Sequence, residues 1–539
     1  MNPTRWVLPR ALSLSLFAAV LLPAAVSAQS LETALNGVDL ASTQVARSPR
    51  LLGMGGLSIA VRDKDNQTNL WDFAGIPVGL GLDDSVSTVE LRPGTGSLSS
   101  VRDLPGGRLR ENMAARGSFL VGEGVYRNRT SGGSFGVVGD LSSLRWDVPY
   151  SGSVERRQGL SHPQVLAVLG GVMPRFLDRH LQYALHLGFR SEKVEETFRS
   201  IITNDAGEWI GGGGDAVTPP SEFEPTDSRA NSTRYGVSTA YSIGRSTKLA
   251  VNLEREIIRI RDMNELVRST SEMTEDRPWL NGQAALVGRL ARDLEYGLDG
   301  SYRMSDSERD WRFTASAGVG AIALTGRGNM FTRSERIRES QARLRWTPGR
   351  AVFAGQVATG FSQVWTDPPK DNDPTSLNRF INEAFNRPGA DTLALPDSIG
   401  PVATQRNALG VTLGASHPIG STLIGVEYRW TRDAHSNSAA GLGPRRVASD
   451  VRVGVERPLG QRLMVRGGYV RRSVDEDDYL NGNEYVANAY TIGLGYSPAN
   501  AAWTMQAGYQ LEFRDQDYAD PGDERQSRQN LALKLRWEF

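Results

Sequence analysis

The sequence predicts an all-β fold, a transmembrane antiparallel up-and-down β-barrel of about 18–20 strands, with about 14–16 strands as the alternative. Segments of roughly ten residues alternate polar and apolar side chains along the chain. Short turns that contain Pro or Gly alternate with long polar connections. No apolar run beyond Ala28 approaches the ~20 residues of a spanning helix. A closed barrel is the only other structure that pairs every backbone polar group within lipid.

The composition fits one large barrel and excludes several other classes of protein. No linker or composition break divides the 539 residues after the amino-terminal region. A hydrophobic content of 39% is sufficient, because only every second strand residue of a barrel faces lipid. The absence of cysteine excludes disulfide and thiolate chemistry. Because basic and acidic residues number 61 each, we expect no nucleic-acid partner.

The amino terminus has the pattern of a secretory signal peptide. Arg5 and Arg10 precede the apolar stretch Ala11–Ala25, and Val26–Ala28 supplies the small residues of a cleavage site. A transmembrane anchor is the alternative, but the stretch is shorter than a spanning helix. The sequence therefore divides into three predicted parts. Residues 1–28 are a signal peptide, residues 29–83 are an amino-terminal periplasmic or luminal segment that could plug the barrel, and residues 84–539 are the transmembrane β-barrel.

Four short turns carry Pro or Gly at the corner and predict hairpin ends on the periplasmic side. Proline fixes φ at the second position of a turn, and glycine accepts positive φ. These turns are Thr347–Arg350, His417–Gly420, Arg457–Gly460 and Ser497–Asn500. The long connections, expected to be extracellular, are roughly 92–115, 142–163, 191–232, 258–281, 366–403, 433–446, 473–486 and 514–527. The weakly patterned segments 84–91 and 311–328 decide the strand count.

Charged side chains at inward-facing strand positions are the predicted lining of the lumen. In the strand over 422–430, Val426 and Tyr428 are expected to face lipid, while Glu427 and Arg429 face inward. In an open channel such residues set ion selectivity; alternatively, they form ion pairs that cross-link the walls. Both signs occur, which argues against strong selectivity for either. The candidates are Arg289, Arg303, Arg343, Arg345, Glu427, Arg429, Arg452, Glu456 and Arg466.

The final strand alternates without a break. Leu531, Leu533, Leu535, Trp537 and Phe539 share one face, and mostly polar residues share the other. This pattern resembles the closing strand of bacterial outer-membrane β-barrels, whose assembly machinery reads a carboxy-terminal aromatic residue. The resemblance implies an integral protein of the Gram-negative outer membrane and an assembly signal at Leu535, Trp537 and Phe539. It also implies outer-membrane lipid, lipopolysaccharide and the barrel-assembly machinery as partners.

A glycine-rich run lies ahead of the predicted barrel. The segment Leu52–Val61 contains Gly-Met-Gly-Gly and is followed by acidic residues and the turn Asp72–Gly75. It resembles the amino-terminal signature of the long-chain fatty-acid transporter superfamily and its secretion-associated relatives, in which this stretch enters the lumen and gates the path. Phe73 replaces the proline of the family's Asn-Pro-Ala-Gly turn, and the predicted strand count is also larger than the family's. The gate residues that the resemblance implies are Gly53, Met54, Gly55 and Gly56.

Within the connection 366–403, apolar residues recur at helical spacing and predict a short amphipathic helix at the barrel mouth. These residues are Leu377, Phe380, Ile381 and Phe385. The functional interpretation is a constriction or an apolar capture site. The alternative, which we favour, is a lid that packs on neighbouring loops.

No constellation in the sequence predicts catalysis or a metal site. The five histidines lack metal-ligand spacing, and no motif marks a nucleophile together with its base. The acidic runs 475–478 and 515–524 lack the regular spacing of a calcium loop. We interpret them as solvated, or as bridged to lipopolysaccharide by divalent ions. We therefore expect a protein that is not an enzyme and that holds neither a cofactor nor a metal.

These features together predict an outer-membrane channel or transporter for passive uptake of a small or hydrophobic solute, gated by the amino-terminal segment. A small hydrophobic ligand is therefore one expected partner. The alternative is a non-transporting barrel that scaffolds a secretion or surface-attachment complex, with the connection 191–232 as a partner surface. An apolar lining near residues 29–83 would favour hydrophobic transport, whereas a plugged, ion-paired lumen would favour the scaffold.

Overall fold

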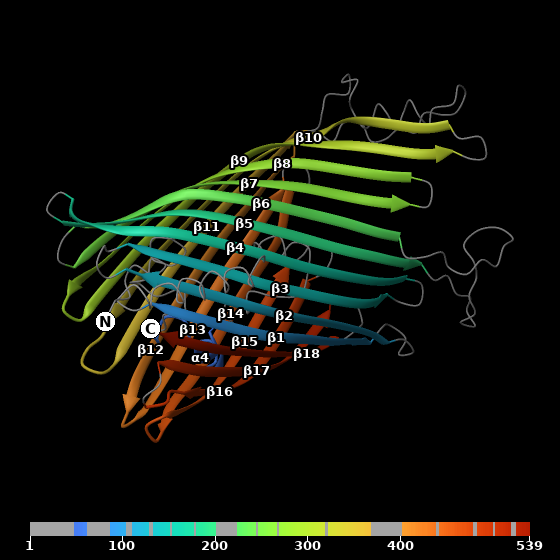
Figure 1. The fold of residues 1–539 in the computed structure, drawn as a ribbon. Helices are drawn as coiled ribbons and strands as arrows, with labels where there is room; N and C mark the ends of the chain where they lie inside the picture. The colour runs from blue at the N-terminus through green and yellow to red at the C-terminus, as the bar shows by residue number, and fades with distance from the viewer. Residues whose placement is uncertain are drawn as a thin grey trace, which may run out of the picture.

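Eighteen antiparallel strands form one closed sheet, and each strand pairs with its neighbours in sequence (Figure 1). The barrel closes because β1 pairs with β18 in a register that places Thr88 opposite Glu538. This is the up-and-down barrel that the alternating pattern predicted. The computed structural model describes residues 48–61, 87–103, 110–128, 133–150, 154–176, 179–200, 224–243, 246–266, 269–317, 322–367, 402–437, 441–477, 482–499, 502–518 and 524–539.

The strands differ in length around the barrel. Strands β8, β9 and β10 have 23, 24 and 25 residues, whereas β15–β18 have 15 or 16. In Figure 1 the green and yellow strands accordingly extend well beyond the red ones. The strands are β1 Thr88–Asp103, β2 Arg110–Arg127, β3 Ser134–Tyr150, β4 Val154–Phe176, β5 Arg179–Ser200, β6 Glu224–Ser242, β7 Thr247–Leu266, β8 Ser269–Ala291, β9 Leu294–Ala317, β10 Ile322–Trp346, β11 Val352–Asp367, β12 Val402–Ile419, β13 Thr422–Asn437, β14 Gly441–Leu459, β15 Leu463–Asp477, β16 Gly482–Tyr496, β17 Trp503–Tyr518 and β18 Glu524–Glu538.

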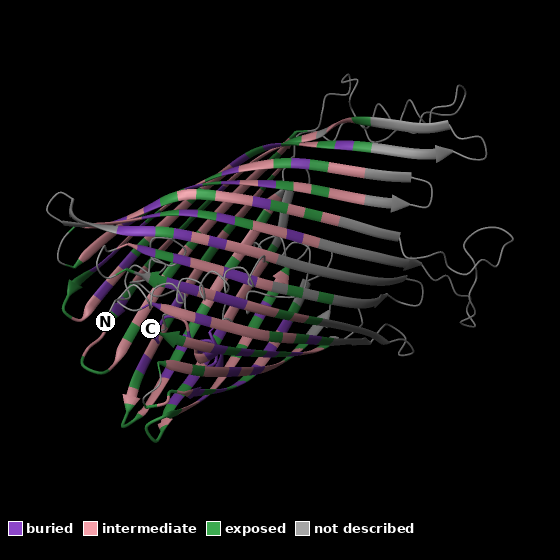
Figure 2. Ribbon diagram, in the orientation of Figure 1, coloured by how far each residue is buried: buried purple, intermediate pink, exposed green. Residues whose placement is uncertain are grey.

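Successive side chains alternate between the lumen and the exterior. In β13, Val426 and Tyr428 are 46% and 43% exposed, whereas Glu427 between them is 1% exposed. The alternation is visible as short bands of colour along each strand in Figure 2. The large apolar side chains on the outer face form a belt, which is the lipid-facing surface of a transmembrane barrel. Members of this belt include Leu169, Leu185, Leu187, Tyr235, Val237, Val251, Leu253, Leu280, Leu298, Leu344, Leu413, Val451, Tyr490, Ile492, Leu494, Leu531 and Leu533.

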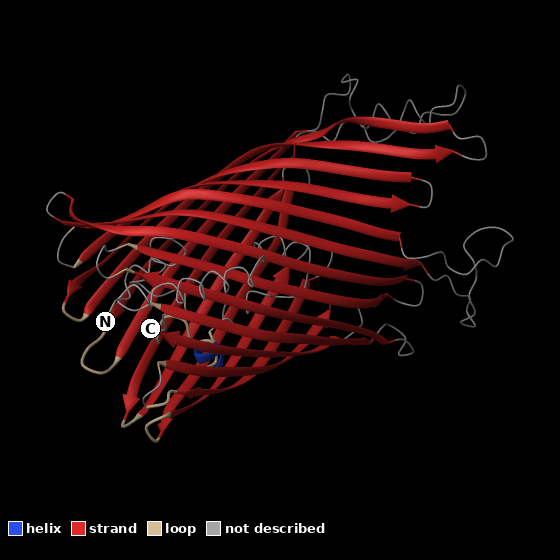
Figure 3. Ribbon diagram, viewed as in Figure 1, coloured by secondary structure: helices blue, strands red, loops and turns tan. Residues whose placement is uncertain are grey.

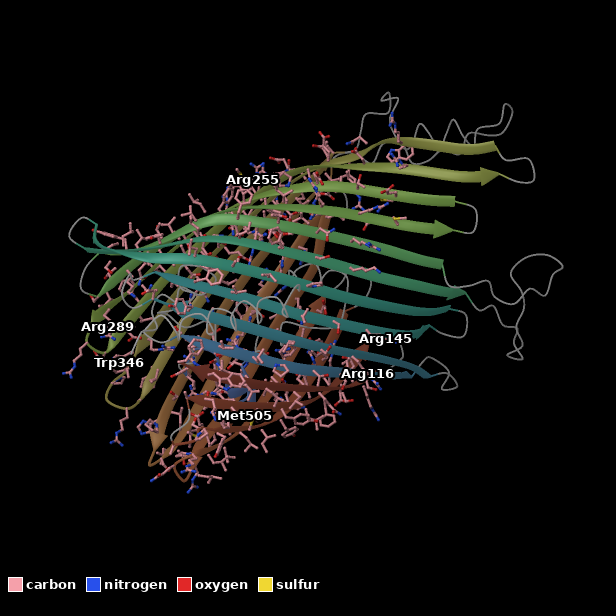
Figure 4. The ribbon with its side chains drawn as sticks, in the orientation of Figure 1. Arg116, Arg145, Arg255, Arg289, Trp346 and Met505 are labelled. Atoms are coloured by element: carbon pink, nitrogen blue, oxygen red, sulfur yellow. The ribbon has the colours of Figure 1, made fainter. Side chains whose placement is uncertain are left out.

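Aromatic residues gather where the strands meet the short turns. Trp346 stacks on Phe353 with ring centroids 5.6 Å apart, and its Nε1–H donates to Asp293 at 2.9 Å. Tyr496 and Trp503 lie close together in the same way, with centroids 5.8 Å apart. Figure 4 shows Trp346 at this end of the barrel. Because aromatic rings with a polar edge favour the membrane interface, these residues mark one boundary of the belt.

The short turns lie close to the predicted positions, but β12 continues to Ile419 and β14 to Leu459, so two of the turns begin only at the last residue of the predicted range. The turn between β10 and β11 has Gly349 with φ +64°, and the β14–β15 turn has Gly460 with φ +73°. Gly420 between β12 and β13 has φ +61°. Only glycine takes this left-handed conformation without strain, so each turn ends its strand sharply. This end of the barrel is designated the short-turn end.

The predicted long connections are wrong in extent, because the strands continue into them. Strands β1 and β2 cover most of 92–115, β3 and β4 most of 142–163, and β7 and β8 nearly all of 258–281. The weak segment 311–328 is likewise the end of β9 and the start of β10. Beyond the membrane both faces of a strand contact water. The backbone ladder therefore continues after the apolar alternation has stopped.

Several sequence predictions fall outside the described residues. The signal peptide over 1–28 and the loop-helix residues Leu377, Phe380, Ile381 and Phe385 are among them. Within the predicted segment 29–83 the structure describes residues 48–61, which include helix α4 (Pro49–Gly53). In the described part of the chain, no helix combines the length and hydropathy needed to cross a bilayer.

Candidate functional site: a luminal segment and its cavity

Residues Ser48–Val61 lie inside the barrel and are designated the luminal segment. Helix α4 contacts β15–β18 and appears in blue within the barrel in Figure 3. The Ser48 hydroxyl caps the helix by accepting the Leu51 N–H at 3.4 Å, and Pro49 occupies the first turn, where no N–H is needed. Gly55 and Gly56 both have φ +70°, so the chain turns sharply after the helix.

Glycines in the wall let the luminal segment approach backbone to backbone. A Cβ placed on Gly468 of β15 would lie 2.2 Å from the backbone nitrogen of Gly55. A Cβ on Gly454 of β14 would lie 2.3 Å from the Met54 carbonyl oxygen. Both distances are far below van der Waals contact, so any side chain at either position would displace the segment. The wall and the segment therefore fit each other closely.

Glu427 of β13 binds the carboxy-terminal part of the luminal segment. Its Oε2 accepts the backbone N–H of Ser58 at 2.7 Å and that of Ile59 at 3.0 Å, and its other oxygen accepts the Ser58 hydroxyl. Three strands away, Arg345 of β10 donates to the Ile59 carbonyl oxygen at 2.9 Å. Glu427 is 1% exposed and Arg345 2% exposed. Water is therefore largely excluded from these contacts.

Two further wall residues bind the backbone near the glycine pair. Arg452 of β14 donates to the Gly56 carbonyl oxygen at 2.5 Å. Thr491 of β16 donates its hydroxyl to the Gly53 carbonyl oxygen at 3.2 Å, and that hydroxyl accepts the Gly55 N–H at 2.9 Å. The wall thus supplies the hydrogen-bond partners that these buried backbone groups require.

Ion pairs that share one carboxylate hold helix α4 against the wall. Arg50 donates to the two oxygens of Glu456 at 3.0 and 2.9 Å, and Arg466 donates to the same carboxylate at 2.6 Å. Glu456 and Arg466 are buried on β14 and β15. Such a paired carboxylate between two guanidinium groups is a charge-assisted contact, stronger than a neutral hydrogen bond.

The apolar side chains of the segment pack mainly on one another. Leu51, Met54, Leu57 and Val61 form a buried cluster, against which Leu423 of β13 packs. Leu57 and Met54 are fully buried. In Figure 2 the helix is accordingly drawn in purple. The segment therefore contributes a small hydrophobic core of its own within a polar lumen.

A cavity of about 680 Å³ lies on the side of the luminal segment away from the short turns. Gly55 and Gly56 form part of its floor, and β8–β17 form its wall. Charged and amide side chains dominate the lining, among them Arg429, Asp450 and Gln356. We designate it the luminal cavity.

The wall on the other side of the barrel pairs its charges internally. His186 of β5 contacts Glu254 of β7 at 2.9 Å. Glu256 of β7 lies 3.2 Å from Arg190 and 3.5 Å from Arg303, whose guanidinium group stacks over Trp279 at 4.8 Å. These are cross-strand pairs, and none of them contacts the luminal segment.

The structure divides the predicted lumen residues into three groups. The first contacts the luminal segment directly or through Glu456, and it comprises Arg345, Glu427, Arg452, Glu456 and Arg466. Arg429 lines the luminal cavity. The third group is paired within the wall and comprises Arg303 with Glu256, Arg343 with Asp299 at 2.7 Å, and Arg289 with Glu295 at 3.7 Å. Figure 4 shows Arg289 at the short-turn end.

The predicted gate residues Gly53, Met54, Gly55 and Gly56 are buried within the luminal segment. Sequence reasoning did not identify Arg50, Ser58 or Thr491, whose partners lie hundreds of residues away in the chain. A usable signal was present in the wall. Gly454, Gly468, Gly493 and Gly508 occupy inward positions on the successive strands β14–β17, and such a row of missing side chains indicates close approach by another backbone.

The predicted assembly-signal residues lie on the closing strand. Leu535 pairs with Leu91 of β1, Trp537 pairs with Val89, and the Phe539 N–H donates to the Ser87 carbonyl oxygen at 3.0 Å. Trp537 and Phe539 are exposed on the outer face. Among the described residues, no three His, Asp or Glu side chains lie close enough together to hold a metal ion.

Comparison of the chain with family models finds no match, and comparison with curated proteins finds none. Among solved structures, it resembles the ferric yersiniabactin uptake receptor FyuA from Yersinia pestis, at 10% identity and a TM-score of 0.41 over 85% of this chain and 80% of that chain. It also resembles the Ralstonia pickettii toluene transporter TbuX, at 13% identity and a TM-score of 0.33 over 91% of this chain and 98% of that chain. The Pseudomonas putida toluene transporter TodX is similar at 10% identity and a TM-score of 0.31 over 90% of this chain and 96% of that chain. Identities and scores this low assign neither a family nor a function to this chain.

Proposed function

We propose that this protein is a gated outer-membrane channel for passive uptake of a small solute, with the luminal segment as its gate. The observation that carries the proposal is the binding site that the barrel wall provides for residues 48–61 inside the lumen. It consists of wall glycines and hydrogen-bonding side chains, and we designate it the seat of the luminal segment. A barrel of this strand number is wide enough to leave an aqueous path. Because every anchor between segment and wall is non-covalent, the segment can leave its seat without breaking the barrel.

Of the two solute classes expected from the sequence, small and hydrophobic, the luminal cavity favours a small polar one. Its lining is rich in arginine, aspartate and glutamine side chains. The apolar residues near the amino-terminal segment pack on each other and do not line the cavity. A hydrophobic solute would have to displace water from charged groups there, which is costly.

The apolar belt and the aromatic residues at the short-turn end support insertion in the bacterial outer membrane. We propose outer-membrane lipid and lipopolysaccharide as its surroundings. The barrel-assembly machinery is the proposed route of insertion, with Leu535, Trp537 and Phe539 as the signal.

The test is single-channel conductance in a planar bilayer, recorded for the intact protein and for a variant that lacks residues 48–61. A second variant, in which a Gly-Ser sequence of equal length replaces these residues, controls for chain length. We expect the intact protein to be closed for most of the time and both variants to conduct steadily. Equal, steady conductance in all three proteins would show that the segment is not a gate.

A non-transporting scaffold is the second candidate, and the ion-paired wall of β5–β9 favours it. In that case the luminal segment is a permanent part of the fold. All three proteins would then remain silent in the bilayer although each is folded and inserted.

A further inference from the structure

We infer that the outer face of the β14–β15 hairpin binds the phosphate of an anionic phospholipid headgroup at the short-turn end. The two arginines of this hairpin, Arg457 and Arg462, form the site, which we designate the headgroup site. The inference rests on the membrane insertion proposed above and does not depend on the gate. It is carried by the depth of Arg457 in the apolar belt, by the position of Arg462, and by the distribution of carboxylates on the hairpin.

Arg457 projects from the lipid-facing surface of β14. Its neighbour Glu456 is buried on the inner face, so the alternation along the strand turns Arg457 outward. The next outward residues on either side are Val455 and Leu459, which are 36% and 50% exposed. Arg457 is itself exposed. An arginine therefore interrupts a row of apolar side chains that belongs to the belt.

The register of the strands gives the depth of Arg457. Leu459 pairs with Leu463 of β15, and Leu463 pairs with Tyr496 of β16. Tyr496 is one of the aromatic residues that mark the boundary of the belt. Arg457 pairs with Val465, which lies two residues further along the strand, or about 7 Å. The Arg457 backbone is therefore inside the belt, one outward row from its boundary.

A guanidinium group at this depth is stable only when its charge reaches the headgroup level. Arginine can lay its aliphatic stem along apolar surface and extend its charged end to the membrane interface. The anions at that level are lipid phosphates. A phosphate accepts two parallel hydrogen bonds from one guanidinium group, and such charge-assisted pairs are the strong ones.

Arg462 lies on the other side of the boundary. It directly precedes Leu463, is exposed, and belongs to the turn that joins β14 to β15. Its carbonyl oxygen accepts the Ser497 N–H of the neighbouring turn at 3.0 Å, which fixes the backbone of Arg462. One hairpin thus carries an arginine just inside the boundary and another just outside it. A headgroup phosphate at the boundary lies between the two levels.

The hairpin provides no anion for these arginines. Among the described residues, no side chain forms an ion pair or a hydrogen bond with the guanidinium group of Arg457 or Arg462. Along the outward face of β14 and β15, the first carboxylate after the short turn is Asp475, which pairs with Val447 near the other end of the hairpin. The anion must therefore come from the surroundings. An acidic protein beyond the turns could reach Arg462, but lipid surrounds the backbone of Arg457.

The experiment places a fluorescent reporter at the site. Because the chain has no cysteine, Gln461→Cys supplies a single labelling position beside Arg462. The full-length protein, labelled with bimane in detergent micelles, is titrated with phosphatidylglycerol that carries a doxyl quencher on an acyl chain. We expect saturable quenching that unlabelled phosphatidylglycerol relieves. Dioleoylglycerol, which has the acyl chains without the phosphate, should not relieve it.

The double variant Arg457→Gln/Arg462→Gln should bind the quencher lipid about thirtyfold more weakly, because each arginine at an anionic membrane surface contributes about fivefold. Arg312→Gln/Arg327→Gln is the matched control. These two exposed arginines lie opposite each other on β9 and β10, so the control makes the same change of charge on another hairpin. We expect it to bind like the intact protein.

Three results would overturn the inference. They are an unchanged affinity in the Arg457→Gln/Arg462→Gln variant, an equal loss in both double variants, and relief of quenching by dioleoylglycerol. Planar-bilayer conductance separates this inference from the proposed function. A protein that conducts as a gated channel but binds phosphatidylglycerol no better than dioleoylglycerol would refute the headgroup site alone. A protein that binds the lipid through these arginines but never conducts would support the site and refute the channel.

Discussion

The two sides of the barrel use their buried charges differently. On β5–β9, Glu256 of β7 pairs with Arg190 of β5 and with Arg303 of β9, each two strands away, so these charged groups have partners within the wall. On β10 and β12–β16, Glu427 and Arg345 instead bind the backbone of the luminal segment. The charged groups of the first wall pair with one another, whereas those of the second also bind the luminal segment. Release of the segment should therefore disturb one side of the barrel and leave the other unchanged.

The largest expected effect comes from a side chain at the seat of the gate. Gly468→Val would place its side chain against Gly55, so the luminal segment cannot occupy its site and the channel should conduct steadily. Gly467→Val is the matched control, because a Cβ there meets nothing closer than an oxygen at 4.0 Å. Planar-bilayer recording of the two variants checks this. Similar conductance from both would mean that the glycine seat is not specific.

Glu256→Ala should lower stability without opening the channel. The substitution leaves Arg190 and Arg303 without their shared carboxylate in a buried wall, which costs about 3–5 kcal/mol. Urea unfolding from liposomes, followed by tryptophan fluorescence, measures the loss, and conductance is recorded on the same preparation. Steady conductance in this variant would contradict the separation of the two walls.

Glu427→Ala should have the reverse profile, opening the channel while the ion pairs of β5–β9 stay intact. It removes the acceptor of the Ser58 and Ile59 N–H groups, and each unsatisfied buried donor costs about 1–3 kcal/mol. We expect the open probability to rise about tenfold or more. Glu427→Gln keeps one oxygen acceptor and should open less often. If channels of the alanine variant stay closed, contacts other than those of Glu427 hold the luminal segment in place.

The smallest effect is expected on the outer face of the same ion-paired wall. Asp306 of β9 lies beyond the apolar belt, where the Ser334 hydroxyl donates to it at 2.6 Å and Arg336 lies 3.0 Å away. These contacts hold the pKa of Asp306 below its usual value. The stabilisation is therefore present above the unfolded-state pKa of about 3.9 and is lost as pH falls through the folded-state pKa.

Because the Asp306 side chain is mostly exposed, Asp306→Asn should cost less than about 1 kcal/mol in the same urea assay at neutral pH. The difference between this variant and Glu256→Ala measures what burial adds to an ion pair. A loss as large as that of Glu256→Ala would show that pairs on the two faces stabilise the wall equally.

The sequence predicted the barrel and its membrane-facing surface because lipid imposes a period of two on the side chains. Val426, Glu427 and Tyr428 alternate as expected, and the corner glycines Gly420 and Gly460 end their strands. The strand ends were not predictable in this way. Outside the membrane, residues such as Arg261 and Glu272 face water and pair across β7 and β8, so no apolar period marks the strand there.

The candidate site was predictable only in part. Alternation placed Glu427 and Arg452 in the lumen, and the resemblance drew attention to the glycines of the luminal segment. Which inward charges meet that segment depends on the register of strands far along the chain. Ser58 and Glu427 are 369 residues apart, and no local pattern encodes their contact.

The long separation between the luminal segment and its seat has a consequence for biogenesis. Residues 48–61 contact wall residues from Arg345 onward to β18, and β1 pairs with β18. Hairpins can form locally and early, but contacts that close loops of several hundred residues must wait for the intervening chain. The seat does not exist until β12–β17 have paired. Seating of the segment is therefore a late event in maturation, which cannot precede the pairing of these strands.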